Sequence, residues 1–337
     1  MIVLFDPKLA RGGGQVVLEQ LLAQLAATED VGLVMPPRGQ RAINIPEHVR
    51  TFDSVARLGH EVEPNMSLLL VANANASFPT VMAAARRFRP AHSIGTVGIV
   101  HNYPSSKFKG IATVQSLKRL DMAVAVEPGL TSLRRDAIVP SWLAPTGPLP
   151  DAGRSIRRTG RIKCYARPDR TKGLHLVPEI FREMERAGLE CSVALGAGLD
   201  RQDRYAAKLR RSLAPWLEEG PRSRSWINSG DVFLIPSLSG EAACLTAQEA
   251  MAAGAWVVAS RIGLMPYLAP QGEAVSTFAI GDVAGAVATL TEVARLPEKD
   301  FADACQRSQA AVAVRHGRWF DTTTALLVRL HAELAAT

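Results

Sequence analysis

The chain has little cysteine, and its four cysteines are scattered through 337 residues. There is no C-x-x-C, and no histidine stands near a cysteine at the spacing of a metal ligand. This distribution argues against a disulfide-rich scaffold and against a structural zinc site. It predicts a reducing compartment, the cytoplasm.

Long hydrophobic runs are also missing. No stretch reaches the roughly 20 apolar residues that a transmembrane helix requires. The first residues, MIVLFDPK, are typical of a strand and a turn, and they lack the basic and apolar regions of a signal peptide. Three common catalytic motifs are absent as well: G-x-S-x-G, the P-loop and H-E-x-x-H.

Acidic residues are fewer than basic ones, 32 against 39, which gives a net charge of +7. The basic residues occur in clusters, at residues 86–89, 107–109, 118–119, 134–135 and 154–161. Few aromatic residues stand among them, and no nucleic-acid module is recognisable, so nucleic-acid binding is disfavoured. The excess suits a solvated surface, an anionic substrate or a negatively charged membrane surface, and charge alone does not separate these.

Length and composition indicate a globular protein of two ordinary domains. A hydrophobic content of 47% with 21% charged residues provides a sizeable core. Strand-like runs at 2–5, 31–35, 67–72, 94–100 and 122–126 alternate with helical stretches at 15–27, 78–88, 111–120 and 128–137. Such alternation predicts a parallel sheet covered by helices on both faces.

The alternation restarts after residues 144–160, a stretch of Pro, Gly and charge that is typical of a linker. Strands are expected at 161–166, 191–198, 231–236, 256–260 and 274–279, and helices at 174–188, 200–217, 242–253 and 281–296. Two Rossmann-like units of similar size are expected to form a ligand-binding cleft between them.

Residues 231–260 are the most informative segment, a predicted strand, loop, helix and strand. Glu241 stands at the mouth of the helix and Glu249 inside it. If both lay on the helix, they would be separated by about 12 Å of rise. The two carboxylates would then face the two ends of an elongated ligand. The helix N-terminus at residues 242–246 would lie between them, suited to an anionic group.

This segment resembles the donor-binding segment of retaining nucleotide-sugar glycosyltransferases of the GT-B fold, especially glycosyltransferase family 4. The matching parts are DVFLIPS, the E-x7-E step, AMAAG and VVAS. The chain departs from the family at Ala242, Ala243 and Cys244, where G-F-G is usual, and at Trp256, where proline is common. Glycine lets backbone amides approach a phosphate closely, so these departures concern how a diphosphate would be held.

The resemblance implies an α/β, GT-B architecture, with two Rossmann-like domains facing across a cleft. Residues 1–147 would form the acceptor-side domain, residues 148–160 the linker and residues 161–318 the nucleotide-sugar-binding domain. The C-terminal helix, at about 319–337, would cross back to the first domain.

The resemblance also implies the donor contacts. The segment YARPDRTKG is similar to the family's G-R-L-x-x-x-K-G, with Arg167 and Lys172 as the two cations and Ala166 in place of glycine. These cations would clamp the diphosphate and neutralise it as it leaves. Glu249 would bind the ribose hydroxyls and Glu241 the sugar hydroxyls. The diphosphate would also contact the amides around Cys244, Leu245 and Thr246.

Two features of the first half complete the expected site. Gly12, Gly13 and Gly14 follow the first strand, where a glycine turn lets amides approach a phosphate or sugar. Their spacing is not G-x-G-x-x-G, which disfavours a dehydrogenase. His101 ends another strand. The resemblance implies that it holds the donor sugar or aids the transfer, although Asn102 replaces the family's aspartate.

We therefore predict a hexosyltransferase that moves a hexose from a UDP- or GDP-sugar to an acceptor hydroxyl with retention and without a protein nucleophile. D-x-D is absent, so no obligatory metal or other cofactor is expected. The acceptor would be a sugar or a lipid-linked sugar, which leaves open a location at the inner membrane surface. Two alternatives remain: a nucleotide-sugar epimerase of the same fold, and a non-catalytic partner or sugar-binding protein.

Overall fold

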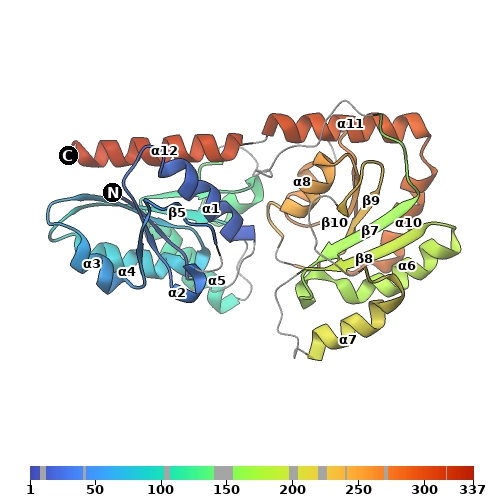
Figure 1. Ribbon diagram of the computed structural model, residues 1–337, viewed down its shortest axis with the longest axis horizontal. Helices are drawn as coiled ribbons and strands as arrows, with labels where there is room; N and C mark the ends of the chain where they lie inside the picture. The colour runs from blue at the N-terminus through green and yellow to red at the C-terminus, as the bar shows by residue number, and fades with distance from the viewer. Residues whose placement is uncertain are drawn as a thin grey trace. The chain divides into compact units, whose positions relative to one another are not determined.

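The computed structural model describes residues 1–7, 13–40, 43–101, 107–139, 155–196, 204–218, 226–239, 241–268, 272–315 and 317–337. The chain divides into two compact units (Figure 1). The first unit consists of residues 1–143 and 317–337, and the second of residues 144–316.

The first unit is built on a six-stranded sheet in the order β3-β2-β1-β4-β5-β6. All of its strand pairs are parallel. The strands are β1 (Ile2–Phe5), β2 (Val31–Val34), β3 (Arg50–Phe52), β4 (Ser67–Ala72), β5 (Ser93–Val100) and β6 (Met122–Ala125). The helices are α1 (Gly13–Leu25), α2 (Pro37–Gln40), α3 (Val55–Glu61), α4 (Phe78–Phe88), α5 (Lys107–Arg119) and α12 (Arg318–Ala335), with 3-10 turns η1 (Asn75–Ser77) and η2 (Pro128–Ser132).

Helix α12 comes from the end of the chain and packs on this first unit, beside β4, β5 and α1 (Figure 1). Trp319 and Phe320 at its start are buried, and the Trp319 indole donates a hydrogen bond to the Ala125 carbonyl at 3.1 Å. The prediction that the C-terminal helix returns to the first domain is confirmed.

The second unit has a five-stranded parallel sheet in the order β11-β10-β9-β7-β8. Its strands are β7 (Arg161–Ala166), β8 (Glu190–Leu195), β9 (Val232–Ile235), β10 (Trp256–Ser260) and β11 (Val275–Phe278). Its helices are α6 (Val177–Arg186), α7 (Arg204–Leu213), α8 (Leu245–Ala252), α9 (Met265–Leu268), α10 (Val283–Arg295) and α11 (Glu298–Arg315), with 3-10 turns η3 (Arg170–Lys172), η4 (Leu174–Leu176) and η5 (Ala214–Trp216).

Apolar periodicity explains how these helices meet their sheets. In α6, Val177, Ile180, Phe181 and Met184 are buried, at the spacing of one helix face, while charged residues fill the other face. Strands β9 and β10 are buried at every position, as expected for parallel strands covered on both faces. The predicted α/β architecture of two parallel sheets with helices is confirmed.

Three local predictions need correction. Residues 128–137, predicted as a helix, contain only the 3-10 turn η2, which begins at Pro128. The short strand β3 and helix α3 were not predicted, because a three-residue strand gives almost no periodic signal. Part of the predicted linker is packed: Ile156 is buried in the core of the second unit, and the Thr159 hydroxyl donates to Asp231 at 2.8 Å.

Among the described helices, none is long and apolar enough to cross a membrane.

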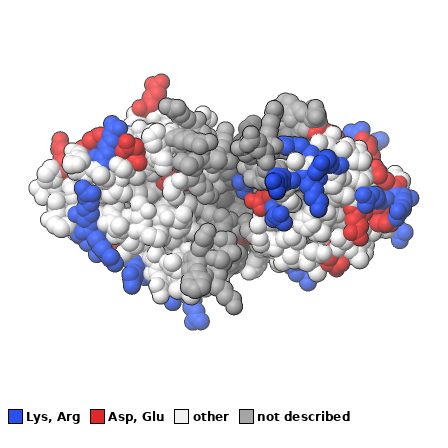
Figure 2. Space-filling model, turned by 90° about the horizontal axis from the view of Figure 1, so that it is seen from below, with Lys and Arg blue, Asp and Glu red and all other residues white. Residues whose placement is uncertain are grey.

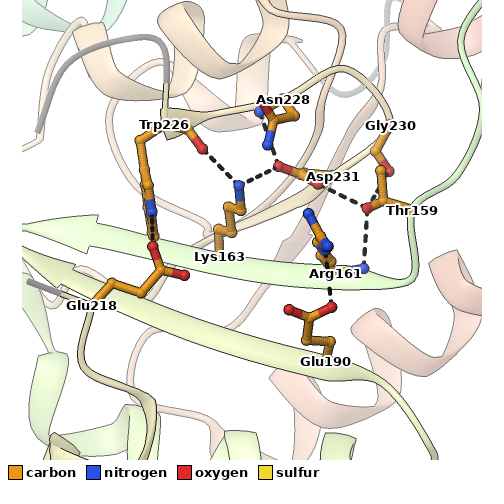
Figure 3. Close-up of polar contacts among 9 residues, drawn as sticks. All are labelled: Thr159, Arg161, Lys163, Glu190, Glu218, Trp226, Asn228, Gly230 and Asp231. Atoms are coloured by element: carbon orange, nitrogen blue, oxygen red, sulfur yellow. Dashed lines mark hydrogen bonds and ion pairs between the residues drawn. The ribbon is translucent and has the colours of Figure 1, made fainter.

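A buried ion pair joins Lys163 of β7 to Asp231, the residue before β9 (Figure 3). The ammonium lies 2.9 Å from the carboxylate, and both side chains are almost fully buried. Lys163 also donates to the Trp226 carbonyl at 2.6 Å, and Asp231 accepts from the Asn228 amide at 2.9 Å. The further hydrogen bonds offset the desolvation of both charges, which makes the pair a structural element at the start of β9.

We expect Asp231→Ala to lower the free energy of unfolding by about 3–5 kcal/mol, because it leaves the Lys163 ammonium buried without its counter-ion. The measurement is urea unfolding followed by tryptophan fluorescence. Glu190→Ala, which breaks the exposed pair with Arg161 shown in the same view, is the control and should change little. The double variant Lys163→Met with Asp231→Leu should recover most of the loss. A single variant as stable as the wild type would contradict this role.

Candidate functional site

Two loops of the second unit are joined by their backbones at the carboxyl end of the sheet. One loop follows β7, and the other follows β9. The Thr171 carbonyl accepts hydrogen bonds from the amides of Leu238 at 2.7 Å and Ser239 at 3.3 Å. Gly173, with φ of 64°, lies so close that a Cβ there would be 1.9 Å from the Pro236 carbonyl oxygen. Only glycine fits this position, since it tolerates both the left-handed conformation and the contact.

This joint brings two of the predicted site residues together. Lys172, from the loop after β7, forms an ion pair with the carboxylate of Glu241, from the loop after β9. Ser237 is buried and donates to the same Glu241 oxygen at 2.7 Å. The two charged side chains are 17% and 11% exposed, so a ligand can reach the pair while bulk water screens it only partly.

Arg167 follows β7 directly and is exposed. In the described part of the chain, no hydrogen bond or ion pair of its side chain is found. Asp169, between the two cations, caps η3 by accepting from the Thr171 amide at 2.8 Å and the Thr171 hydroxyl at 2.7 Å. Burial acts to raise the pKa of Asp169, but the Thr171 hydrogen bonds and the charges of Arg167 and Lys172 outweigh it. The pKa is therefore lowered, and the cap stays ionised.

Helix α8 begins later than predicted. Its first residue is Leu245, so the predicted helical residues 242–244 lie outside it, and Glu241 is not on the helix. The 12 Å separation that depended on a shared helix therefore does not apply. Cys244 precedes the helix with φ of 43°, a left-handed conformation. This is the position of the last glycine in the family's G-F-G, so the chain keeps a glycine-like backbone there with another residue.

The start of α8 has no side-chain cap among the described residues. The Cys244 side chain makes no capping hydrogen bond, and the amides of Ala247 and Gln248 already bond to the Cys244 carbonyl. The amides of Leu245 and Thr246 thus stand at the positive end of the helix, where an anion is favoured. Glu249 lies one turn further along, on the same face as Leu245, and both side chains are half-buried.

The surroundings of Cys244 are unfavourable for a nucleophilic thiol. Burial raises its pKa well above the usual range, and the neighbouring Glu241 carboxylate raises it further. A thiol that stays protonated is a poor nucleophile, since the thiolate is the reactive form.

The first unit has its own polar group at the carboxyl end of its sheet. His101 directly follows β5 and is 8% exposed, and its Nε2 lies 3.3 Å from Oδ1 of Asn73, the residue after β4. The Asn73 amide nitrogen donates to Asp6, the residue after β1, at 2.8 Å and to the Gly14 carbonyl at 3.1 Å. Asn73 thus links two of the predicted site residues, His101 and Gly14.

Gly13 and Gly14 open helix α1, while Gly12 lies outside the described residues, as does Asn102. The structure therefore places the predicted residues in two groups, His101 with the glycine turn in the first unit and the remainder in the second.

Sequence reasoning missed several members of both groups. Asp6 and Asn73 each directly follow a strand, and polar residues at that position of a parallel sheet are a recognised signal. Ser237 offered no such signal. Gly263 was also missed, and it packs closely against the backbone of Glu241. Its φ is 58°, and a Cβ there would lie 2.4 Å from the Glu241 carbonyl oxygen, so only glycine fits. Among the described residues, no group of three or more His, Cys, Asp or Glu side chains is arranged to hold a metal ion.

Comparison with known protein families finds a match in the second unit. Residues 160–295 match the family model described as "Glycosyl transferases group 1". A search of curated protein sequences finds no match.

Solved structures resemble the chain over nearly its whole length. A structure of Anabaena HepE in complex with UDP-glucose has a TM-score of 0.76 at 16% identity and covers 97% of this chain and 99% of its own. Sucrose-phosphate synthase from Thermosynechococcus elongatus has a TM-score of 0.73 at 17% identity, covering 100% and 99%. The α,α-trehalose-phosphate synthase (UDP-forming) from Burkholderia vietnamiensis has a TM-score of 0.67 at 15% identity, covering 97% and 99%. The resemblance to GT-B glycosyltransferases of group 1 is confirmed, by sequence in the second unit and by fold throughout.

We expect Gly173→Ala to separate the two loops, because the new methyl group would meet the Pro236 carbonyl at 1.9 Å. Gly188→Ala is the matched control: its φ is also positive, at 81°, but a Cβ there meets nothing within 4 Å. Gly188→Ala should cost about 1–2 kcal/mol of unfolding free energy from the backbone alone. Gly173→Ala should cost at least about 2 kcal/mol more. Equal losses in urea unfolding would show that the contact with Pro236 is unimportant.

Proposed function

We propose that the protein is a retaining glycosyltransferase that moves a hexose from a UDP- or GDP-sugar to an acceptor hydroxyl. The observation that carries this proposal is the group at the carboxyl end of the second sheet, in the unit that matches the family model. Two cations, a carboxylate and an uncapped helix start lie there, on loops that the contact between Thr171 and Leu238 joins. The complex of the structurally similar HepE with UDP-glucose supports the same ligand class.

In the proposed complex, Lys172 exchanges its bond with Glu241 for one with the diphosphate. Glu241 in turn accepts hydrogen bonds from the sugar hydroxyls, with Ser237 fixing its carboxylate. Arg167 and the amides of Leu245 and Thr246 contact the diphosphate from the ends of β7 and α8. Charge-assisted hydrogen bonds of this kind are the strong ones.

Glu249 accepts hydrogen bonds from the ribose hydroxyls in this proposal. His101 and the glycine turn of the first unit keep the roles that the resemblance implies.

The chemical step breaks the bond between the anomeric carbon and the diphosphate oxygen, and the diphosphate leaves with the electron pair. The acceptor oxygen bonds to the anomeric carbon on the same face, and its proton passes to a leaving phosphate oxygen. The cations stabilise the negative charge that develops on the leaving group. No side chain attacks the sugar, and we propose that neither a metal nor another cofactor is required.

We expect the double variant Arg167→Ala with Lys172→Ala to lose transfer by at least about 100-fold while it stays folded, because the leaving group loses two cations. Calorimetry with UDP- and GDP-sugars and product analysis with EDTA present are the measurements.

Glu249→Gln should weaken donor binding in the same calorimetry. Glu292→Gln, which changes an exposed carboxylate on α10, is its matched control and should leave donor binding unchanged.

Four outcomes would contradict the proposal. Wild-type turnover in the double variant would remove the clamp. A requirement for Mg²⁺ would contradict metal independence. An epimer or free sugar formed from the donor alone would favour the epimerase, and a protein that binds no nucleotide sugar would be a non-catalytic one.

We further propose that the acceptor is presented at an anionic membrane surface, and that α7 contacts it. Arg204, Lys208 and Arg211 are exposed and stand at the spacing of one helix face, opposite the buried Ala206 and Leu209. Helix α7 has no acidic residue, and none of these three forms an ion pair with a described residue. Figure 2 shows basic side chains gathered on the second unit, on the side where α7 lies in Figure 1. Such a stripe attracts anionic lipid headgroups.

Reversal of Arg204, Lys208 and Arg211 to Glu should weaken binding to phosphatidylglycerol vesicles by about 100-fold or more, since each basic residue near such a surface contributes about 1 kcal/mol, or about fivefold. Sedimentation with vesicles is the measurement, and binding should also fall as salt rises. The control makes the same change of charge at the end of α4, at Arg86 and Arg87 of the helix and at Arg89, its C-cap. Equal loss in both variants, or wild-type binding no stronger than to neutral vesicles, would overturn the α7 assignment.

A further inference from the structure

The amide of Asn73 can be oriented from its surroundings alone. One of its terminal atoms lies 2.8 Å from an Asp6 carboxylate oxygen and 3.1 Å from the Gly14 carbonyl oxygen. Both neighbours are acceptors, so that atom must be the donating nitrogen, Nδ2. The carbonyl oxygen, Oδ1, therefore faces Nε2 of His101, at 3.3 Å.

This orientation fixes the tautomer of the neutral imidazole. An amide oxygen only accepts hydrogen bonds, so Nε2 of His101 must carry the hydrogen. We propose that Asn73, held by Asp6, is a positioning residue that keeps the neutral His101 ring in the Nε2–H tautomer. The basic nitrogen of that ring is then Nδ1.

The support for Asn73 is rigid. The backbone N–H of Asn73 donates to the Phe5 carbonyl at 3.0 Å, and the backbone N–H of Asp6 donates to the Val34 carbonyl at 3.1 Å. Gln15 donates a second side-chain hydrogen bond to the same Asp6 oxygen, at 3.1 Å. Asp6 and Asn73 are essentially fully buried, and each follows one of two neighbouring parallel strands, β1 and β4. A carboxylate that accepts from two amides in this setting gives the Asn73 amide one favoured orientation.

The consequence for the reaction rests on the proposed function. If His101 takes part in transfer, it acts through Nδ1 as an acceptor of a hydrogen bond or proton, and Nε2 stays bonded to Asn73 throughout. Asn73 and Asp6 need not touch the ligand. They set which nitrogen carries the hydrogen and hold the plane of the ring.

The direct test is nuclear magnetic resonance on the full chain with ¹⁵N-labelled histidine. The chain has seven histidines, and the signals of His101 are identified by their loss in His101→Gln. Long-range proton–nitrogen correlations distinguish the two tautomers at a pH where the ring is neutral. We expect the Nε2–H pattern in the wild type without any ligand, and the Nδ1–H pattern would overturn the proposal by itself.

Asn73→Leu tests the positioning role, because it keeps similar volume but removes the acceptor. We expect the single tautomer to be lost in this variant and kcat to fall about 10- to 100-fold, with a changed pH profile and little change in donor KM. Ser77→Ala is the matched control. Ser77 is buried at the same edge, and its hydroxyl donates to the Phe5 carbonyl at 2.9 Å, but it takes no part in the hydrogen bond between His101 and Asn73. It should keep the Nε2–H pattern.

An Asn73→Leu variant that keeps the wild-type tautomer and pH profile would overturn the positioning role. If that variant does not fold, the wild-type spectrum still decides the tautomer, and Asp6→Asn, which retains an acceptor oxygen, should preserve it. The test is also separate from the proposed function. If the protein has the Nε2–H tautomer but binds no nucleotide sugar, the positioning role of Asn73 stands and the transferase is excluded. If it binds a nucleotide sugar but has the Nδ1–H tautomer, only the positioning role is excluded.

Discussion

The hydrogen bonds from the Leu238 and Ser239 amides to the Thr171 carbonyl determine the geometry of the second unit's site. They join two loops that are far apart in sequence and that leave neighbouring strands, β7 and β9. Without this joint, Lys172 and Glu241 would belong to separate flexible turns. With it, the end of β7, the loop after β9 and the start of α8 form one framework.

The framework is nearly neutral as it stands. Lys172 and Glu241 compensate each other, so a ligand must replace both halves of the pair to bind well. A simple anion would satisfy the lysine but leave a partly buried carboxylate without its partner, which is costly. A ligand that carries an anionic group beside several hydroxyls satisfies both. The same contact that stabilises the loops thereby favours sugar nucleotides over free phosphate, under the proposed function.

Features set by residues close together in the sequence could be predicted, and features set by contacts between distant residues could not. Buried parallel strands and long amphipathic helices have strong local patterns, and α4 begins and ends where its sequence indicated. The E-x7-E segment identified the family because the order of its residues is specific. The backbone of Cys244 was beyond prediction: a positive φ at a non-glycine residue is imposed by its surroundings, and sequence propensity opposes it. The hydrogen bonds of Ser237 and Asn73 depend on contacts between distant loops, which no local pattern contains.

Helix α12 constrains the order in which the two units can complete their folds. Its residues cover β4, β5 and α1 of the first unit, and Trp319 fills a fully buried position beside Ala125. Chains emerge from the ribosome with their N-terminal part first, and domains generally fold as units. Here the half that is synthesised first lacks part of its own hydrophobic core until the last helix has been made. The intervening half contains all its strands and helices before then, so the later-synthesised unit can complete its fold ahead of the earlier one.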